Sequence, residues 1–188
     1  MADAILSSRS LYTGWLNLLL QRVRLGDEES ERPIIEHPSG SAVLPYDPVR
    51  RVALTVRETR TPVLYLGQPR FAEPVAGVGE DDSAADTARR EAQEEVGVRL
   101  GRVDRVGLVW MTPASTTERV HLFLAEYSQA DRVSEGGGAE DENERIDVRE
   151  ESLAALWDHA ESGAMTDAKL LLLLQALRIR RPELFEPA

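Results

Sequence analysis

Three glutamates lie within five residues in the stretch ARREAQEEVGV, at Glu91, Glu94 and Glu95. If this stretch is helical, Glu91 and Glu95 project from one face, because residues four apart are neighbours on a helix. Carboxylates this close repel one another unless a positive charge lies among them. That charge could come from an arginine side chain or from Mg²⁺, a hard cation that prefers oxygen ligands.

Arginine is the simpler source of that charge. Arg90 precedes Glu94 by four residues and could pair with it along the helix surface. An exposed pair of this kind is worth only about 0.3–0.5 kcal/mol. Charge runs are usually solvated helix faces, so the spacing alone favours arginine. The context favours the metal, because a glycine-rich turn, VAGVGEDD, precedes the segment and Gly97 ends it abruptly.

The carboxylate segment is predicted to be a helix with strands before and after it. Ser83 or Asp82 can cap its amino end, and Gly97 supplies a left-handed stop. Strands are expected in RVALTVRETR, VDRVGLVWM, ERVHLFLAEY and RIDV. Helices are expected in REESLAALWDHAESG and TDAKLLLLLQALRIRR, the second ended by Pro182. This order of elements predicts an α/β fold, a mixed sandwich around one core.

Two other regions give weaker patterns. LYTGWLNLLLQRVRL is compatible with a helix and with a strand. PIIEHPSGSAVLPYDP is expected to form two short strands joined by a Ser-Gly turn, a hairpin-like arrangement. TPVLYLGQPRFAEPVAGVGEDDS has three glycines and several prolines, so we expect mostly turns with short extended pieces.

Composition narrows the possible partners. The formal net charge is −11 and the sequence pI is about 4.8. Such a chain repels nucleic acid backbones and anionic membrane surfaces, and it needs a divalent cation to hold a phosphate ligand. There is no cysteine, which excludes disulfides and thiolate metal sites. No secretory signal or membrane span is recognisable. We therefore expect a cytoplasmic protein with neither a nucleic acid nor a membrane partner.

RREAQEEVGV resembles the second half of the Nudix box, whose pattern is Gly, five residues, Glu, seven residues, Arg-Glu-aliphatic-any-Glu-Glu-any-Gly-aliphatic. The matching positions are Arg90, Glu91, Ala92, Glu94, Glu95, Gly97 and Val98. The first half departs from the pattern. Asp82 stands at the place of the early glutamate, and the early glycine comes one place late, at Gly77 after Ala76.

FLAEYS, SEGGGAEDENERIDV and TDAKLLLLLQAL resemble the Nudix branch that hydrolyses nucleotide sugars, especially GDP-mannose and ADP-ribose pyrophosphatases. The resemblance covers about residues 11–185. It implies an α/β/α sandwich with a mixed sheet, built from an amino-terminal β-hairpin region at residues 1–47, which forms a homodimer, and a Nudix hydrolase domain at 48–188. The ambiguous opening stretch is therefore expected to form strands.

The resemblance implies an activity. A nucleoside diphosphate sugar such as GDP-mannose or ADP-ribose would be cleaved at its pyrophosphate, giving a nucleoside monophosphate and a sugar phosphate. Mg²⁺ is the implied cofactor, with Mn²⁺ as a substitute. A carboxylate base is useful beside Mg²⁺, because this metal lowers the pKa of water less than zinc does.

The resemblance also assigns roles to residues. The implied metal ligands are Glu91, Glu95, Glu144 and the backbone carbonyl of Ala76. Glu142 is the implied general base, Arg60 the substrate-binding residue, and Arg90 and Glu94 orient the ligands. Without the resemblance, the glycine-rich acidic loop that carries Glu142 and Glu144 suits a solvated segment equally well.

Four residues depart from the branch and keep alternatives open. Glu58 and Thr59 replace the usual glutamine and phenylalanine beside Arg60, and Ala114 and Ser115 replace two glycines. One alternative is a Nudix-fold binding module that has lost turnover. Another is a hydrolase of a different substrate, such as a dinucleoside polyphosphate, coenzyme A or a capped RNA, although the acidic charge argues against RNA.

Overall fold

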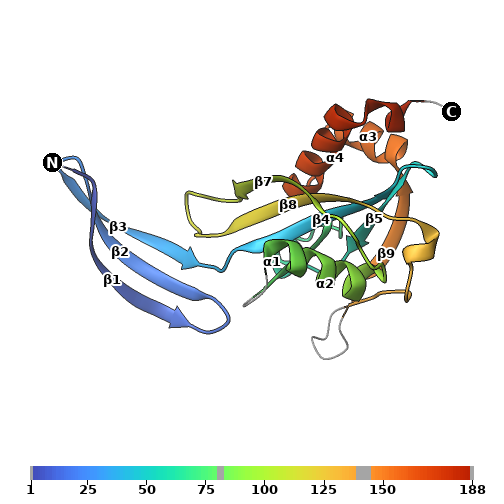
Figure 1. The fold of residues 1–188 in the computed structure, drawn as a ribbon. Coiled ribbons are helices and arrows are strands. Elements are labelled where there is room, and N and C mark those ends of the chain that lie inside the picture. Colours follow the sequence, from blue (N-terminus) through green and yellow to red (C-terminus); the bar gives the residue numbers. More distant parts are fainter. Residues whose placement is uncertain (1, 80–82, 139–144, 187–188) are drawn as a thin grey trace. The chain divides into compact units, whose positions relative to one another are not determined.

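A computed structural model of the chain describes residues 2–79, 83–138 and 145–186. The chain forms two compact units. The smaller unit comprises residues 1–39 and 109–120, and the larger one comprises residues 40–108 and 121–188. Each unit has a sheet of its own. Figure 1 shows both sheets, coloured along the chain from blue at the N-terminus to red at the C-terminus.

The smaller unit is built on a three-stranded antiparallel sheet. Its strands are β1 (Ala4–Thr13), β2 (Asn17–Leu25) and β3 (Glu28–Glu36), in the order β1-β2-β3. Gly26 has a φ of 63°, which suits the tight turn between β2 and β3. The stretch that was compatible with either helix or strand is therefore a strand, as the family resemblance implied.

The strands on either side of Ser39 do not form the expected hairpin. β3 pairs with β2 along its whole length, whereas β4 (Gly40–Asp47) belongs to the sheet of the larger unit. Between them the His37 N–H donates to Thr117 Oγ1 at 2.9 Å, and Pro38 has no N–H to offer. The backbone therefore leaves the first sheet at this point, and the pairing predicted from the Ser-Gly turn is wrong.

The larger unit contains a six-stranded mixed sheet with the order β7-β8-β4-β5-β9, and β6 pairs with β4. Besides β4, its strands are β5 (Val52–Arg57), β6 (Val75–Val78), β7 (Asp104–Trp110), β8 (Arg119–Glu126) and β9 (Asp147–Ser152). Both β5 and β6 lie antiparallel to β4, β5 opposite its carboxyl end and β6 opposite its amino end. The predicted strands at β5, β7, β8 and β9 are confirmed.

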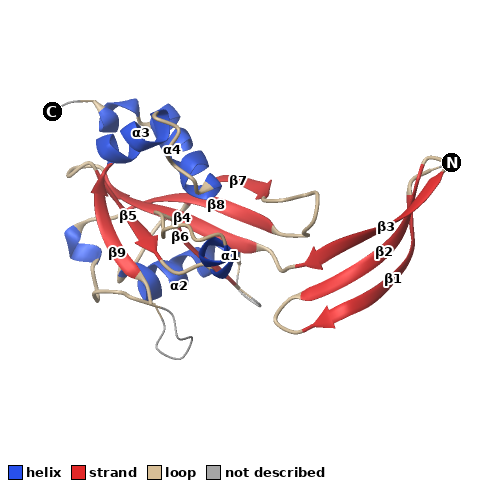
Figure 2. Cartoon of the chain, turned by 180° about the vertical axis from the view of Figure 1, so that it is seen from behind, coloured by secondary structure: helices blue, strands red, loops and turns tan. Residues whose placement is uncertain are grey.

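Helices cover both faces of this sheet. α2 (Ala84–Val96) lies on one face, and α3 (Leu153–Glu161) and α4 (Ala168–Arg180) lie on the other, as Figures 1 and 2 show from opposite sides. The predicted α/β/α sandwich is thus confirmed. Short helices complete the fold: α1 (Thr61–Tyr65), η1 (Gln129–Asp131) and η3 (Pro182–Phe185). None of the described helices combines the length and apolar composition that a membrane-spanning helix needs.

α1 was not expected, because its segment was predicted to be turns and extended pieces. Pro62 lies in its first turn, where the fixed φ of proline suits a helix and its missing N–H costs no hydrogen bond. The glycine and prolines of the segment limit the helix to five residues. None of these five residues is buried.

α2 begins and ends where its sequence predicted. The Ser83 side chain accepts a hydrogen bond from the Asp86 N–H, and Gly97 adopts the left-handed conformation with a φ of 68°. The helix buries its apolar face against the sheet, and each large apolar side chain buried in this way contributes roughly 1.5–3 kcal/mol. The core on this face contains Val43, Leu54, Val56, Val75, Ala88, Ala92, Val96, Val98, Leu100, Phe123, Ala125 and Tyr127.

Candidate active site

Two glutamates of α2 are buried on the side of the helix that faces β6. Glu91 is 9% exposed and Glu95 is 5% exposed. The Ala76 N–H of β6 donates to Glu95 Oε2 at 3.4 Å. The helical spacing therefore brings Glu91 and Glu95 together on one face, beside the backbone of Ala76.

Gly77 makes this close approach possible. A Cβ atom at position 77 would lie 2.0 Å from Glu91 Oε1, which no side chain can tolerate without displacing the carboxylate. β6 is fixed against β4, with Ala76 opposite Ala42 and Gly77 opposite Ser41. Gly77, which comes one residue later than the glycine of the box pattern, thus lies where the backbone of β6 contacts the carboxylate of Glu91.

Arg90 contacts both neighbouring glutamates. Its Nη1 donates to Glu94 Oε2 at 2.8 Å, its Nη2 lies 2.7 Å from Glu91 Oε1, and Nη2 also donates to the Val78 carbonyl at 3.1 Å. Burial acts to lower the pKa of Arg90, but the charges of Glu91 and Glu94 outweigh it and raise that pKa overall. The arginine pair considered from the sequence is therefore present, and it joins α2 to the end of β6.

Arg60 lies between two carboxylates. Its Nε and Nη2 donate to Glu73, each at 3.0 Å, and Nη1 forms an ion pair with Glu58. Burial acts to lower the pKa of Arg60, but the hydrogen bonds and charge of Glu73, with the charges of Glu58 and Glu95, raise it overall. The guanidinium of Arg60 is thus held by carboxylates on two sides, Glu73 and Glu58.

Glu73 was missed in the sequence, although it is 3% exposed and lies directly before the Pro-Val-Ala-Gly segment. Lys169, the single lysine of the chain, lies 3.5 Å from Glu73 Oε2 and 2.7 Å from Asp167 Oδ2. A row of alternating charges therefore runs from Glu58 through Arg60, Glu73 and Lys169 to Asp167, which caps α4. The only sequence signal for Glu73 was an acid inside an otherwise apolar stretch, FAEPVAG.

The acidic loop is anchored to the carboxyl end of α2. The Gly137 N–H donates to the Glu95 carbonyl at 2.8 Å, and the Gly138 N–H donates to the Glu94 carbonyl at 3.3 Å. On the other side of the loop, the Ile146 N–H donates to the Gly137 carbonyl at 3.4 Å. The residues that flank 139–144 on both sides thus lie at the helix that carries Glu91 and Glu95.

Two expected site residues belong to the acidic loop. Glu142 and Glu144, assigned as the base and a metal ligand, lie outside the described residues. Among the residues that the structure does describe, no cluster of three or more His, Cys, Asp or Glu side chains could hold a metal ion. The carboxylates of Glu91 and Glu95 are hard oxygen donors, which suit Mg²⁺ better than they suit a soft metal.

The segment with two replaced glycines has a structural role in the smaller unit. The Ser115 carbonyl accepts from the Ile35 N–H at 2.7 Å, and the Thr117 N–H donates to the Ile35 carbonyl at 3.0 Å. These bonds attach the segment to the end of β3.

Residues 37–174 match the model of the NUDIX domain family. The chain is 36% identical over 152 residues to a GDP-mannose pyrophosphatase of Cronobacter sakazakii, covering 80% of this chain and 78% of that protein. It is 34% identical over 151 residues to the GDP-mannose pyrophosphatase of an Enterobacter species, covering 79% and 78%.

A solved structure has the same fold. The crystal structure of an ADP compounds hydrolase superposes with a TM-score of 0.77 at 16% sequence identity, covering 97% of this chain and 96% of the other. At this identity the likeness concerns the fold alone. It extends over both units of the chain, including the three-stranded sheet.

Proposed function

The chain belongs to the Nudix family and is a hydrolase of pyrophosphate bonds. From this premise we propose that it cleaves nucleoside diphosphate sugars and that Mg²⁺ is its cofactor. GDP-mannose and ADP-ribose are the proposed substrates, and Mn²⁺ is a possible substitute for Mg²⁺. The observation that carries the proposal is the burial of Glu91 and Glu95 side by side at the backbone of Ala76 and Gly77.

The donor set of the site supports the cofactor. Glu91, Glu95 and the Ala76 carbonyl would hold Mg²⁺, and Glu144 would complete the set. When bound, the ion neutralises the charge of the diphosphate and stabilises the charge that develops in the transition state. A protein with a net charge of −11 needs such a counter-charge to hold a dianionic substrate.

The chain's own side chains would supply the other steps. Glu142 would accept the proton of the attacking water, which it can do only when ionised. Arg60 would bind a phosphate oxygen through its guanidinium, which offers parallel N–H donors. Arg90 orients Glu91 and Glu94 through its bonds to both, and it holds the Val78 carbonyl at the end of β6.

The substrate class rests on the relatives. Two relatives that match the chain over about four fifths of its length are GDP-mannose pyrophosphatases. The row of charges around Arg60 supports an anionic substrate, because a phosphate could exchange with Glu58 as a partner of the guanidinium.

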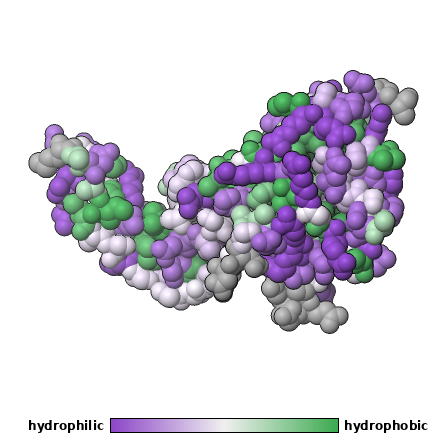
Figure 3. All heavy atoms as spheres, in the orientation of Figure 1, coloured by the Kyte–Doolittle hydropathy of each residue, from purple (hydrophilic) through white to green (hydrophobic). Residues whose placement is uncertain are grey.

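We also propose that residues 1–47 form a homodimer contact and that 48–188 form the hydrolase domain, acting in the cytoplasm. Large apolar side chains are exposed on the three-stranded sheet and at its turns, among them Ile5 at 64%, Tyr12 at 61% and Trp15 at 81%. Figure 3 shows hydrophobic side chains gathered on the surface of this sheet. Exposed apolar patches of this kind favour association with another chain.

The test is hydrolysis of GDP-mannose and ADP-ribose by the purified protein with Mg²⁺, with Mn²⁺, and with a chelator. Glu95→Gln should lower kcat at least about 100-fold, because a catalytic metal supplies several kcal/mol of transition-state stabilisation. Gln93→Ala, at an exposed position of the same helix, is the control and should retain activity. Hydrolysis by Glu95→Gln at the parental rate would disprove this metal site.

A further inference from the structure

A cavity of about 720 Å³ lies in the larger unit between the segment 62–72 and α3. This α1–α3 cavity has mostly apolar walls, formed by Pro62, Val63, Leu66 and Phe71 on one side and by Leu156 on the other. Small-molecule sites typically have volumes of about 300–1,000 Å³ and mostly apolar walls with a few polar groups. Its volume and walls are therefore those of a small-molecule site.

The α1–α3 cavity is not the proposed hydrolytic centre. Its lining includes neither the α2 glutamates nor the Ala76 backbone nor Arg60. It is bounded by β9 and by α3, which lies on the face of the sheet opposite α2. A ligand here would thus bind away from the carboxylates of the proposed hydrolytic centre.

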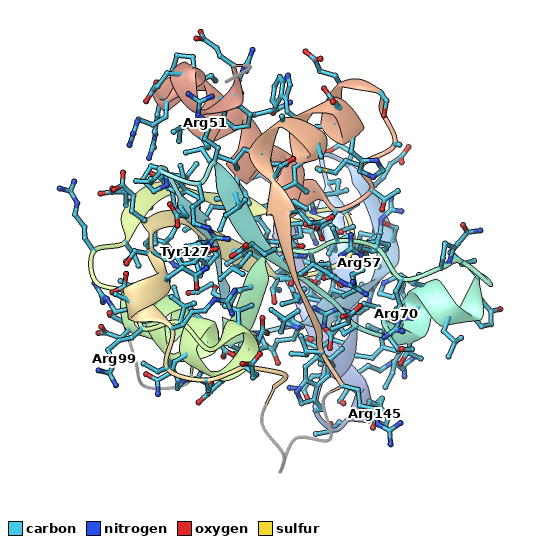
Figure 4. All side chains as sticks on the ribbon, turned by 90° about the vertical axis from the view of Figure 1, so that its right-hand side faces the viewer. Arg51, Arg57, Arg70, Arg99, Tyr127 and Arg145 are labelled. Carbon is cyan, nitrogen blue, oxygen red and sulfur yellow. The ribbon has the colours of Figure 1, made fainter. Side chains whose placement is uncertain are left out.

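The charges that line the cavity favour an anion. Arg57 is neutralised by Glu151, which accepts from Arg57 Nη2 at 2.9 Å and from the Thr55 hydroxyl. Arg70 also lines the cavity, and it has neither an ion pair nor a hydrogen bond with any other described residue. Figure 4 shows Arg57 and Arg70 on the side of the larger unit that carries α1. Within the part of the chain that the structure describes, the positive charge of Arg70 is therefore not compensated by an acidic partner.

We propose that the α1–α3 cavity is a second binding site, which takes a small organic anion with an apolar body. The apolar body would lie against Phe71 and Leu156, where water is displaced from apolar surface. The anionic group would lie at Arg70, whose planar guanidinium binds carboxylates, phosphates and sulfonates through parallel N–H donors. The exposed ring of His159 lines the same cavity and offers a further polar contact.

The probe for the test is 8-anilinonaphthalene-1-sulfonate, an aromatic sulfonate whose fluorescence rises in apolar surroundings. We expect saturable binding to the full-length protein. Ala155→Trp places an indole in the cavity from an exposed position of α3 and should weaken binding at least tenfold. Ala154→Trp, at the neighbouring exposed position that does not line the cavity, is the matched control and should change affinity less than twofold.

A second pair of measurements tests the charge without altering the apolar walls. Arg70→Gln should weaken binding of the sulfonate about tenfold, whereas Arg9→Gln, an exposed arginine of the smaller unit, should not. N-phenyl-1-naphthylamine has the same body without the sulfonate, and its affinity should be unaffected by Arg70→Gln. Glu95→Gln should bind the probe as the parent does, which separates this site from the proposed hydrolysis.

Two results would overturn the proposal. One is the absence of saturable binding to the parent protein. The other is equal affinity of the parent, Ala155→Trp and Arg70→Gln for the sulfonate. Melting curves from circular dichroism establish that each variant is folded, and if Ala155→Trp is not, the Arg70 comparison with the two probes decides.

Discussion

The buried carboxylate of Glu73 accepts hydrogen bonds from Arg60 Nε and from Arg60 Nη2, each at 3.0 Å. The backbone of Glu73 is fixed in turn, because its N–H and its carbonyl both bond to Val56, each at 2.9 Å. Lys169 approaches the same carboxylate at 3.5 Å. Glu73 thus holds the guanidinium of Arg60 in one orientation.

Glu73→Gln should impair substrate binding through Arg60. The amide keeps the shape of the side chain but loses the charge and one of the two acceptor oxygens that Arg60 uses. We expect KM for the nucleotide sugar to rise about tenfold, since a hydrogen bond to a charged group is worth about 1.5–3 kcal/mol. The value of kcat should change much less, because Glu73 touches no reacting atom.

Glu58→Gln provides the contrast in the same steady-state assay. It removes the other carboxylate that pairs with Arg60. A substrate phosphate would then no longer compete with a Glu58 carboxylate for the guanidinium of Arg60, so KM should fall. An unchanged KM in Glu73→Gln would show that Arg60 does not bind substrate in the orientation described.

The parts of the site that depend on local sequence could be predicted, and those that depend on distant contacts could not. The ends of α2 follow from Ser83 and Gly97, and the shared face of Glu91 and Glu95 follows from helical spacing alone. Glu73 meets Lys169, which lies far along the chain, and no local pattern encodes such a contact.

Strand pairing shows the same limit. The Ser-Gly turn predicted a strand on each side of it, but the membership of β3 and β4 in different sheets depends on partners elsewhere in the chain. β3 meets Thr117 and Ser115, which are about 80 residues away. The general base and one metal ligand, Glu142 and Glu144, were assigned by family resemblance and remain predictions.

Gly77→Ala should lower activity more than stability. The new methyl group would lie 2.0 Å from Glu91 Oε1, and the end of this flexible side chain can move aside more cheaply than backbone can. We therefore expect a folded protein whose hydrolysis rate falls at least tenfold and whose requirement for Mg²⁺ rises. Gly101→Ala is the control, because a Cβ atom there meets nothing within 4 Å. Equal rates for the two variants would contradict the role of Gly77.

Glu150 should make stability depend on pH. It accepts hydrogen bonds from Arg50 Nη1 and from the Tyr127 hydroxyl, each at 2.9 Å, and lies 3.5 Å from Arg132 Nη2. The hydrogen bonds from Arg50 lower the pKa of Glu150 below its ordinary value of 4.5, although burial opposes them. A carboxylate with a lowered pKa in the folded state stabilises the protein above pH 4.5, and this contribution is lost as pH falls through the folded-state pKa.

The measurement is urea denaturation of the parent and of Glu150→Gln at several pH values between 7 and 3. The parent should be more stable at neutral pH, and the difference in free energy of unfolding should shrink once pH falls below 4.5. Because the two proteins differ at one titrating group, the difference isolates Glu150 from the other acids. A difference that stays constant over this range would refute the assignment.

Gly136→Ala should show whether hydrolysis depends on the position of the acidic loop at the end of α2. Gly136 has a φ of 73°, and a Cβ atom there would lie 2.4 Å from the Glu95 carbonyl oxygen. Backbone atoms cannot yield as a side chain does, so the loop must shift away from the end of α2. If Glu142 and Glu144 act from this loop, hydrolysis should fall at least tenfold.

Gly163→Ala is the matched control for that variant. It shares the left-handed conformation, with a φ of 76°, but a Cβ atom there meets nothing within 4 Å. Both variants should lose about 1–2 kcal/mol of stability, because a side chain is strained at positive φ. Only Gly136→Ala should lose activity in the Mg²⁺-dependent assay, since only its methyl group displaces the loop from the helix of Glu91 and Glu95. Parallel losses of activity in the two variants would mean that strain alone, and not the position of the acidic loop, accounts for the effect.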